Sequence, residues 1–161
     1  MIENRDVGGR KDRHGHSLDE VEVMCGECGC RSQMIDGREM YPHRPDLSDL
    51  LFYRCSCGAS VGTHKGTREP LGTPANPRTK AARSAAHAVF DPLWKASEAK
   101  KQGQGNARKR GYRWLAGELG IPFDECHIGM MDAETADRVR QICLPHIRRL
   151  GIEPEDRGRG R

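Results

Sequence analysis

Two closely spaced cysteine pairs constrain this sequence more than any other feature. Cys25 and Cys28 are separated by two residues, Cys55 and Cys57 by one, and a glycine follows each pair directly. Zn²⁺ takes four ligands in a tetrahedron, and two nearby thiolates from each segment supply them in pairs. A glycine after the second cysteine allows the positive φ with which the chain can turn beneath a metal. The pairs therefore predict a Zn²⁺ site formed by these four cysteines.

Three other interpretations of the cysteines remain open, and the ligand set has an alternative. Disulfides suit an oxidising compartment, but no charged start followed by an apolar run opens the sequence. A redox Cys-x-x-Cys normally begins a helix in a βαβ unit, and buried structural cysteines seldom occur in two such pairs. Cys30 is a fifth thiol that could replace a neighbouring ligand. We expect metal-binding thiols in a reducing, cytoplasmic environment.

Short alternating segments surround the cysteine pairs. Asp36-Gly37 lies between two such segments, and this dipeptide favours a two-residue hairpin because both turn positions prefer φ > 0. The expected strands are 33–35, 38–41, 51–54 and 59–62. The sequence thus predicts a small antiparallel sheet with the metal at one end, a zinc ribbon over residues 20–64.

Residues 65–150 predict a loop followed by three helices, which makes the fold class α+β. The first helix opens at Arg78 and has one apolar face, and Pro92 is expected to kink or restart it. We expect this helix to dock on the ribbon through its alanines, Phe90 and Trp94. The second helix is expected over 107–119, and the third follows an N-cap at Asp132.

The two ends of the chain are polar and rich in glycine. We expect residues 1–19 to form a flexible arm and residues 151–161 a flexible Arg/Gly tail. Only 5% of the residues are aromatic, so the core is lean and a metal would contribute much of the folding free energy of the ribbon. No apolar run is long enough to span a bilayer, so we expect no membrane partner.

Positive charge is concentrated in one part of the chain. Between residues 78 and 113 there are ten basic and two acidic residues, an excess of +8 in a chain whose net charge is +4. Such a stretch can contact phosphates with a salt-dependent affinity, although a solvated basic face is the simpler interpretation. The sequence favours a nucleic-acid-binding accessory protein. The candidate contact residues are Arg78, Lys80, Arg83, Lys100, Lys101, Arg108, Lys109, Arg110 and Arg113.

Several longer motifs resemble a zinc-finger-containing family found in bacteria and their phages. The motifs are Val61-Gly-Thr-His64-Lys65-Gly, Pro70-Leu-Gly72, the run from Ala86 to Trp94, Leu119-Gly-Ile-Pro, and Cys126-His127-Ile-Gly129. The resemblance covers roughly Cys25 to Cys143. It implies a zinc ribbon followed by a helical part, and it implies no particular activity. Relatives tend to have a two-residue gap in both cysteine pairs, whereas Cys55 and Cys57 are one residue closer.

An enzyme and a protein-interaction module are the alternative functions. His64, Lys65, His87, Asp91 and His127 are the polar residues of these motifs, and together they could form a metal-dependent phosphodiesterase or nuclease site. His87 and Asp91 are four residues apart on one helix face, so the carboxylate could orient the imidazole. A structural role of these residues is the simpler interpretation. The third class is a phage or bacterial protein that binds or inhibits a protein partner.

Overall fold

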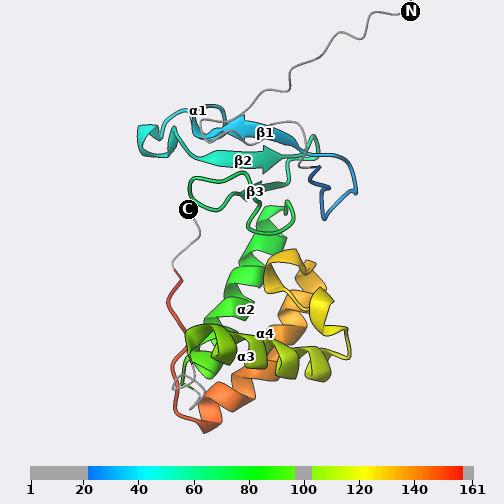
Figure 1. Cartoon of the computed structure of the whole chain (residues 1–161), viewed down its shortest axis with the longest axis vertical. Helices are drawn as coiled ribbons and strands as arrows, with labels where there is room; N and C mark the ends of the chain where they lie inside the picture. Colours follow the sequence, from blue (N-terminus) through cyan, green and yellow to red (C-terminus); the bar gives the residue numbers. More distant parts are fainter. Residues whose placement is uncertain (1–21, 97–102, 158–161) are drawn as a thin grey trace, which may run out of the picture.

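The chain forms a small sheet and a group of packed helices that lie one above the other (Figure 1). The computed structural model describes residues 22–96 and 103–157. The strands are β1 (Gln33–Asp36), β2 (Leu51–Arg54) and β3 (Ser60–Gly62), and the helices are α1 (Gly37–Met40), α2 (Pro77–Ala96), α3 (Gln104–Leu119) and α4 (Ala133–Arg149), with short 3-10 turns at Pro45–Leu47, Phe123–Glu125 and Ile128–Met130. We call residues 22–76 the ribbon half and residues 77–157 the helical half. The predicted α+β class is confirmed.

The ribbon half contains one antiparallel sheet with the order β1-β2-β3. Tyr53 of β2 pairs with Met34 of β1 and with Val61 of β3, and its buried phenol donates a hydrogen bond to the Arg68 carbonyl at 2.9 Å. Two isolated bridges join the edge of the sheet to the loop that follows, one of them between Ser60 and Ala75. The loop after residue 64 is therefore paired with the sheet as far as Ala75.

The predicted hairpin at Asp36-Gly37 is wrong. The Asp36 carboxylate accepts a hydrogen bond from the Glu39 N–H at 3.0 Å and thereby caps α1, so residues 38–41 do not form a strand. Gly37 has no positive φ and is buried against the chain near Leu47, where an added Cβ would lie 1.7 Å from the Leu47 carbonyl oxygen. Aspartate favours helix caps as well as turns, and here close packing selects the cap.

The helical half has its own apolar core between α2, α3 and α4. Phe90, Leu115, Val139 and Ile147 are almost fully buried in it, together with Ile128 from a connecting turn. Asp132 caps α4, because its carboxylate accepts a hydrogen bond from the Thr135 N–H at 2.7 Å, as predicted. The three predicted long helices are all present. Gly120, with φ 71°, is the C-cap of α3.

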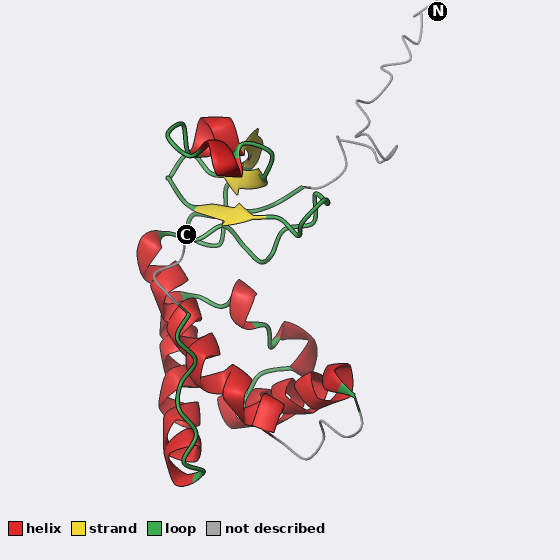
Figure 2. Cartoon of the chain, turned by 90° about the vertical axis from the view of Figure 1, so that its left-hand side faces the viewer, coloured by secondary structure: helices red, strands yellow, loops and turns green. Residues whose placement is uncertain are grey.

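Pro92 lies inside α2, so the helix does not restart there. Proline has no N–H, so the Ala88 carbonyl one turn earlier lacks its usual helical donor. The Glu155 N–H donates to this carbonyl at 2.9 Å instead. The C-terminal segment therefore runs along α2, as Figure 2 shows, and Arg157 pairs with Asp91 on the same helix. Glu155 and Arg157 thus contact α2, whereas residues 158–161 of the predicted tail and the predicted N-terminal arm 1–19 lie outside the described residues.

The two halves meet at the N-terminal end of α2. Asn76 caps α2 by accepting a hydrogen bond from the Thr79 N–H, and the Asn76 N–H itself donates to the carboxylate of Glu27 at 3.0 Å. Lys80 donates to the Ser60 hydroxyl of β3 at 2.7 Å. Arg83 donates to the carbonyls of Thr73 and Met131 at 2.8 and 2.7 Å. Polar side chains thus join the halves.

The expectation that α2 docks on the ribbon through its alanines, Phe90 and Trp94 is wrong. Phe90 and Trp94 belong to the core of the helical half, where they pack with residues of α3 and α4.

Within residues 22–96 and 103–157, no helix combines the length and the apolar character that crossing a bilayer would require.

Candidate metal centre and basic surface

The first cysteine pair lies on a tight turn next to the start of the ribbon half. The Gly29 N–H donates to the Cys25 carbonyl at 3.0 Å, and the Cys25 N–H donates to the Cys30 carbonyl at 2.8 Å. Gly29 has φ 72°, a conformation that a side chain would strain. This turn brings the thiols of Cys25 and Cys28 to the same side of the loop.

The second pair lies on the turn that joins β2 to β3. The Cys55 N–H donates to the Ala59 carbonyl at 2.8 Å, and the Gly58 N–H donates to the Cys55 carbonyl at 2.9 Å. Gly58 has φ 92°, so both glycines adopt the conformation expected beneath a metal. The shorter gap does not prevent Cys57 from reaching the first pair.

The four predicted thiols form one cluster. Their Sγ atoms all lie within 4.8 Å of one another, and two contacts join the pairs, at 3.6 Å for Cys25 and Cys57 and 3.4 Å for Cys28 and Cys55. Four thiolates at about 2.3 Å from a Zn²⁺ ion would be separated by about 3.8 Å. The cluster fits a tetrahedral ion that joins two segments about thirty residues apart in sequence.

Burial and hydrogen bonding divide the ligands into two kinds. Cys25 and Cys55 are buried, whereas Cys28 and Cys57 are exposed. A hydrogen bond from the Cys57 backbone N–H, together with contacts from the three neighbouring thiols, lowers the pKa of the Cys55 thiol to about 6, and this favours the thiolate that binds a metal. Cys30 is exposed and lies outside the cluster, with its Sγ 3.9 Å from the Cys28 carbonyl oxygen.

Two of the five candidate catalytic residues, His87 and Asp91, contact each other directly. His64 and Lys65 are exposed on a ribbon turn, where the His64 N–H donates to the Glu69 carbonyl. His127 packs beside Tyr112, with 5.2 Å between the centres of the two rings. Among the described residues, the four cysteines form the only group of His, Cys, Asp and Glu side chains that could hold a metal.

His87 and Asp91 do meet on α2, with 3.3 Å between Nδ1 and the carboxylate. Asp91 is buried, and it also accepts a hydrogen bond from the Trp94 indole N–H at 3.1 Å and pairs with Arg157. Burial raises the pKa of Asp91, but these hydrogen bonds and the nearby positive charges lower it on balance. The carboxylate therefore holds helix and tail together, and this geometry gives no support to a nuclease centre.

The basic candidates separate into internal and external residues. Lys80 and Arg83 bond to groups of the protein at the junction, and burial lowers the pKa of both. Arg78 lies 3.5 Å from Asp137 of α4, whereas Lys100 and Lys101 lie outside the described residues. The other four candidates are exposed on α3, and these are Arg108, Lys109, Arg110 and Arg113.

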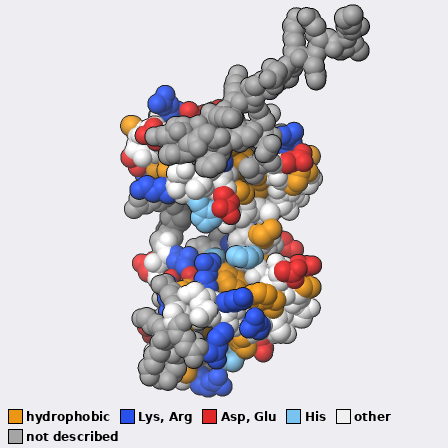
Figure 3. Space-filling view, in the orientation of Figure 1, with side chains coloured by type: hydrophobic (Ala, Val, Ile, Leu, Met, Phe, Trp, Pro, Cys, Tyr) orange, Lys and Arg blue, Asp and Glu red, His pale blue; other side chains and the backbone are white. Residues whose placement is uncertain are grey.

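A neighbouring group of basic residues on α4 escaped the sequence analysis. Arg110 of α3 lines a pocket of about 470 Å³ together with His146 and Arg149 of α4. Lys and Arg side chains gather over this part of the helical half in Figure 3. The signal was present in the basic last turn of α4, but the sequence does not reveal that this turn packs beside α3.

Comparison with known proteins adds one finding to this geometry. Residues 21–145, more than half of the chain, match the model of a family described as a zinc-finger-containing domain. A search of the curated proteins and a search of the solved structures each found no significant match. The matched residues include all four clustered cysteines and the three long helices up to residue 145, as the resemblance implied. The chain belongs to the zinc-finger-containing domain family.

Proposed function

We propose that this protein binds nucleic acid through the helical half, while Zn²⁺ at the four cysteines holds the ribbon half in its fold. The observation that carries the proposal is that Arg110 and Arg149 line one pocket. Basic residues of two helices thereby belong to one surface, which we call the α3–α4 basic surface. Arg110 and Arg149 form its centre, and Arg108, Lys109, Arg113 and Arg148 are the further exposed basic residues of the same two helices that we include in it.

The exposed basic side chains of this surface are better suited to binding phosphates than to making contacts within the protein. Exposed Lys and Arg side chains neutralise phosphates and release counterions, which contributes a large part of nucleic-acid affinity. The guanidinium of Arg108 lies 5.6 Å from the centre of the Tyr112 ring, and that of Arg113 lies 5.4 Å from the Phe123 ring. Contacts of this kind restrict long side chains, so less conformational entropy is lost on binding. The proposal includes a reducing, cytoplasmic setting, because disulfides would remove the thiolate ligands.

Fluorescence anisotropy with labelled single-stranded and duplex DNA and RNA tests the proposal. The variant is Lys109→Gln with Arg110→Gln, and the matched control is Arg38→Gln with Lys65→Gln, which removes two exposed positive charges from the ribbon half. We expect wild type and control to bind with a steep salt dependence. In the variant, the slope of log K against log salt should fall by roughly one to two units, because two phosphate contacts are lost.

Metal content and circular dichroism are measured for all three proteins, so that a folding defect is not mistaken for a binding defect. If the control loses as much affinity as the variant, the contact surface lies elsewhere. If no protein binds any of the four nucleic acids at low salt, the proposed function is wrong, and a protein partner becomes the leading alternative.

A further inference from the structure

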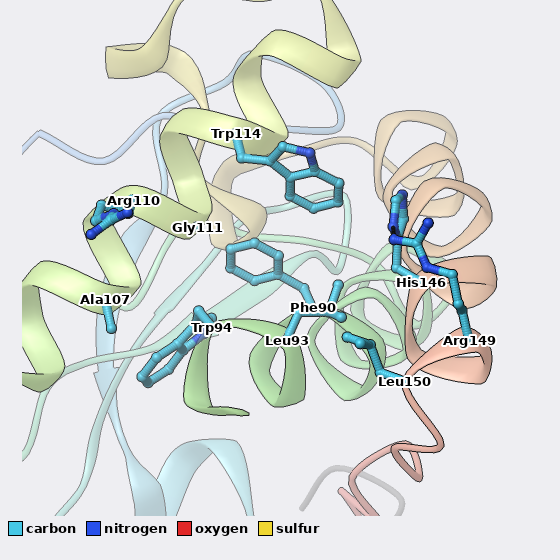
Figure 4. A pocket seen from close by; sticks show the side chains of 10 residues that line it. All are labelled: Phe90, Leu93, Trp94, Ala107, Arg110, Gly111, Trp114, His146, Arg149 and Leu150. Atoms are coloured by element: carbon cyan, nitrogen blue, oxygen red, sulfur yellow. Dashed lines mark hydrogen bonds between the residues drawn. The ribbon is translucent and has the colours of Figure 1, made fainter. Parts of the chain in front are cut away.

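The pocket beside Arg110 combines an aromatic floor with a basic rim (Figure 4). Its walls come from three helices and the residue after α4, with Phe90, Leu93 and Trp94 from α2, Ala107, Arg110, Gly111 and Trp114 from α3, and His146, Arg149 and Leu150 at the end of α4. None of these lining residues is acidic. A pocket of about 470 Å³ lies within the range of small-ligand sites.

Gly111 allows the floor of the pocket to close. A Cβ at this position would lie 2.9 Å from the Trp94 Cβ and 3.3 Å from the Phe90 ring, so only glycine permits this close approach of α3 to α2. Trp114 lies three residues further along α3 and is only partly buried. Because its ring borders the pocket, it offers an aromatic surface to a ligand.

The basic residues of the rim line the same pocket as the Trp114 ring. The Trp114 and His146 rings meet edge to face, with 5.2 Å between their centres. An Arg149 nitrogen lies 3.1 Å from His146 Nδ1, and because a guanidinium group only donates hydrogen bonds, Nδ1 is the acceptor in this contact. Arg149 is thereby held at one side of the pocket, and Arg110 lies on the other in Figure 4.

We propose that this pocket takes one unpaired base of a single-stranded nucleic acid. The base stacks on Trp114, and the phosphates on either side of it meet Arg110 and Arg149. This inference rests on the proposed function and names its ligand class. Single-stranded sites combine a basic track with aromatic rings on which bases stack, and both features occur here. The basic rim favours an anionic ligand over an apolar peptide side chain, and a duplex keeps its bases within the stack.

The test compares a short thymidine oligomer with an abasic oligomer of the same length, which keeps the phosphates and lacks the bases. The full chain, loaded with metal, should bind the abasic strand about tenfold or more weakly, because one stacked base is lost. The thymidine oligomer should quench the tryptophan fluorescence more than the abasic strand does.

Trp114→Leu provides the second arm, because leucine keeps the apolar contacts and removes the stacking surface. This variant should bind both oligomers with equal affinity, at the level of the abasic strand with wild type. Arg38→Gln serves as the matched control and should retain the preference for bases. Circular dichroism verifies that the variant is folded.

Each outcome decides one question. If wild type binds both strands equally, the base pocket is wrong while the proposed function stands, and an apolar side chain of a protein partner is then the better occupant. If Trp114→Leu folds and keeps the preference for bases, stacking occurs elsewhere and the inference is also wrong. If neither strand binds at low salt, the proposed function itself fails.

Discussion

The buried apolar cluster of the ribbon half consists of Cys25, Cys55 and Ala59, whereas that of the helical half extends over α2, α3, α4 and their connections. Two of the three residues in the smaller cluster are metal ligands. The other buried apolar residues of the described ribbon half, Val23, Tyr53, Pro74 and Ala75, lie outside this cluster. The larger cluster contains whole aliphatic and aromatic side chains, including Leu115 and Ile147 at 0% exposure.

This difference means that two sources of stability act in one chain. Apolar burial stabilises the helical half directly, at about 25 cal/mol per Å². A structural metal stabilises a small ribbon because binding and folding of such a module are a single process. The polar contacts of Lys80 and Arg83 join the halves without making either core continuous with the other.

Removing one metal ligand should produce the largest effect. Cys28→Ser is expected to release the ion and unfold the ribbon half, because structural Zn²⁺ binding contributes about 10–16 kcal/mol in small zinc modules. Two-dimensional NMR should show collapse of the signals of β1, β2 and β3 while those of α3 and α4 persist. Elemental analysis should find no stoichiometric metal.

Cys30→Ser is the matched control for this change, since Cys30 is a neighbouring exposed thiol outside the cluster. It should retain the metal and the sheet. Loss of the helices together with the ribbon in Cys28→Ser would show that the two halves fold as one unit and would contradict the comparison.

A cavity in the helical core should have the next largest effect, on the opposite half. Ile147→Ala is expected to cost about 2–5 kcal/mol of the free energy of unfolding, because a buried aliphatic side chain is lost and a cavity remains. Leu150→Ala, at a position 58% exposed, should stay within about 0.5 kcal/mol. Denaturant unfolding followed by circular dichroism measures both values, and metal content should remain stoichiometric in both variants.

The metal ligands were predictable because thiol chemistry and local spacing are sufficient for them. Cys25, Cys28, Cys55 and Cys57 lie on turns whose glycines are visible in the sequence. The three long helices were predictable for the same reason, since apolar periodicity and caps such as Asp132 are local signals.

Tertiary contacts account for the parts that local patterns did not reveal. Asp36 could form a turn or cap a helix, and the approach of the chain at Leu47 to Gly37 decides between them. From the sequence, Lys80 and Arg83 would be expected to be surface charges. In the structure they donate hydrogen bonds to residues up to 48 positions away in the sequence. The metal site was therefore found, whereas the docking of the halves and the pairing of α3 with α4 were not.

The contact of the C-terminal segment should contribute less than the core. Glu155→Pro removes the N–H that bonds to the Ala88 carbonyl, and leaving this carbonyl unpaired should cost about 1–3 kcal/mol of the stability of the helical half. Glu155→Gln is the control, because it keeps the N–H and removes only the charge that pairs with Lys95 and with Arg157. Each of these ion pairs should contribute less than about 1 kcal/mol. Equal stabilities of the two variants in thermal unfolding would show that the backbone bond contributes nothing.

Thiol labelling requires no mutation. It shows whether the metal or apolar burial protects each cysteine from the reagent. Burial raises the pKa of the Cys126 thiol to about 11 and that of the Cys143 thiol to about 12, so both thiols stay protonated at neutral pH. Because the thiolate is the form that reacts with an alkylating reagent, both should be unreactive in the folded protein. The metal protects the four clustered thiols, and Cys30 remains exposed.

Mass spectrometry after alkylation at neutral pH should therefore count one adduct in the native protein, five after a chelator and seven after a denaturant, out of seven cysteines in all. The step from one to five reports the ribbon half alone, and the step from five to seven reports the helical half. If chelation exposed all seven thiols at once, the core around Cys126 and Cys143 would depend on the metal, and the two halves would not differ in what stabilises them.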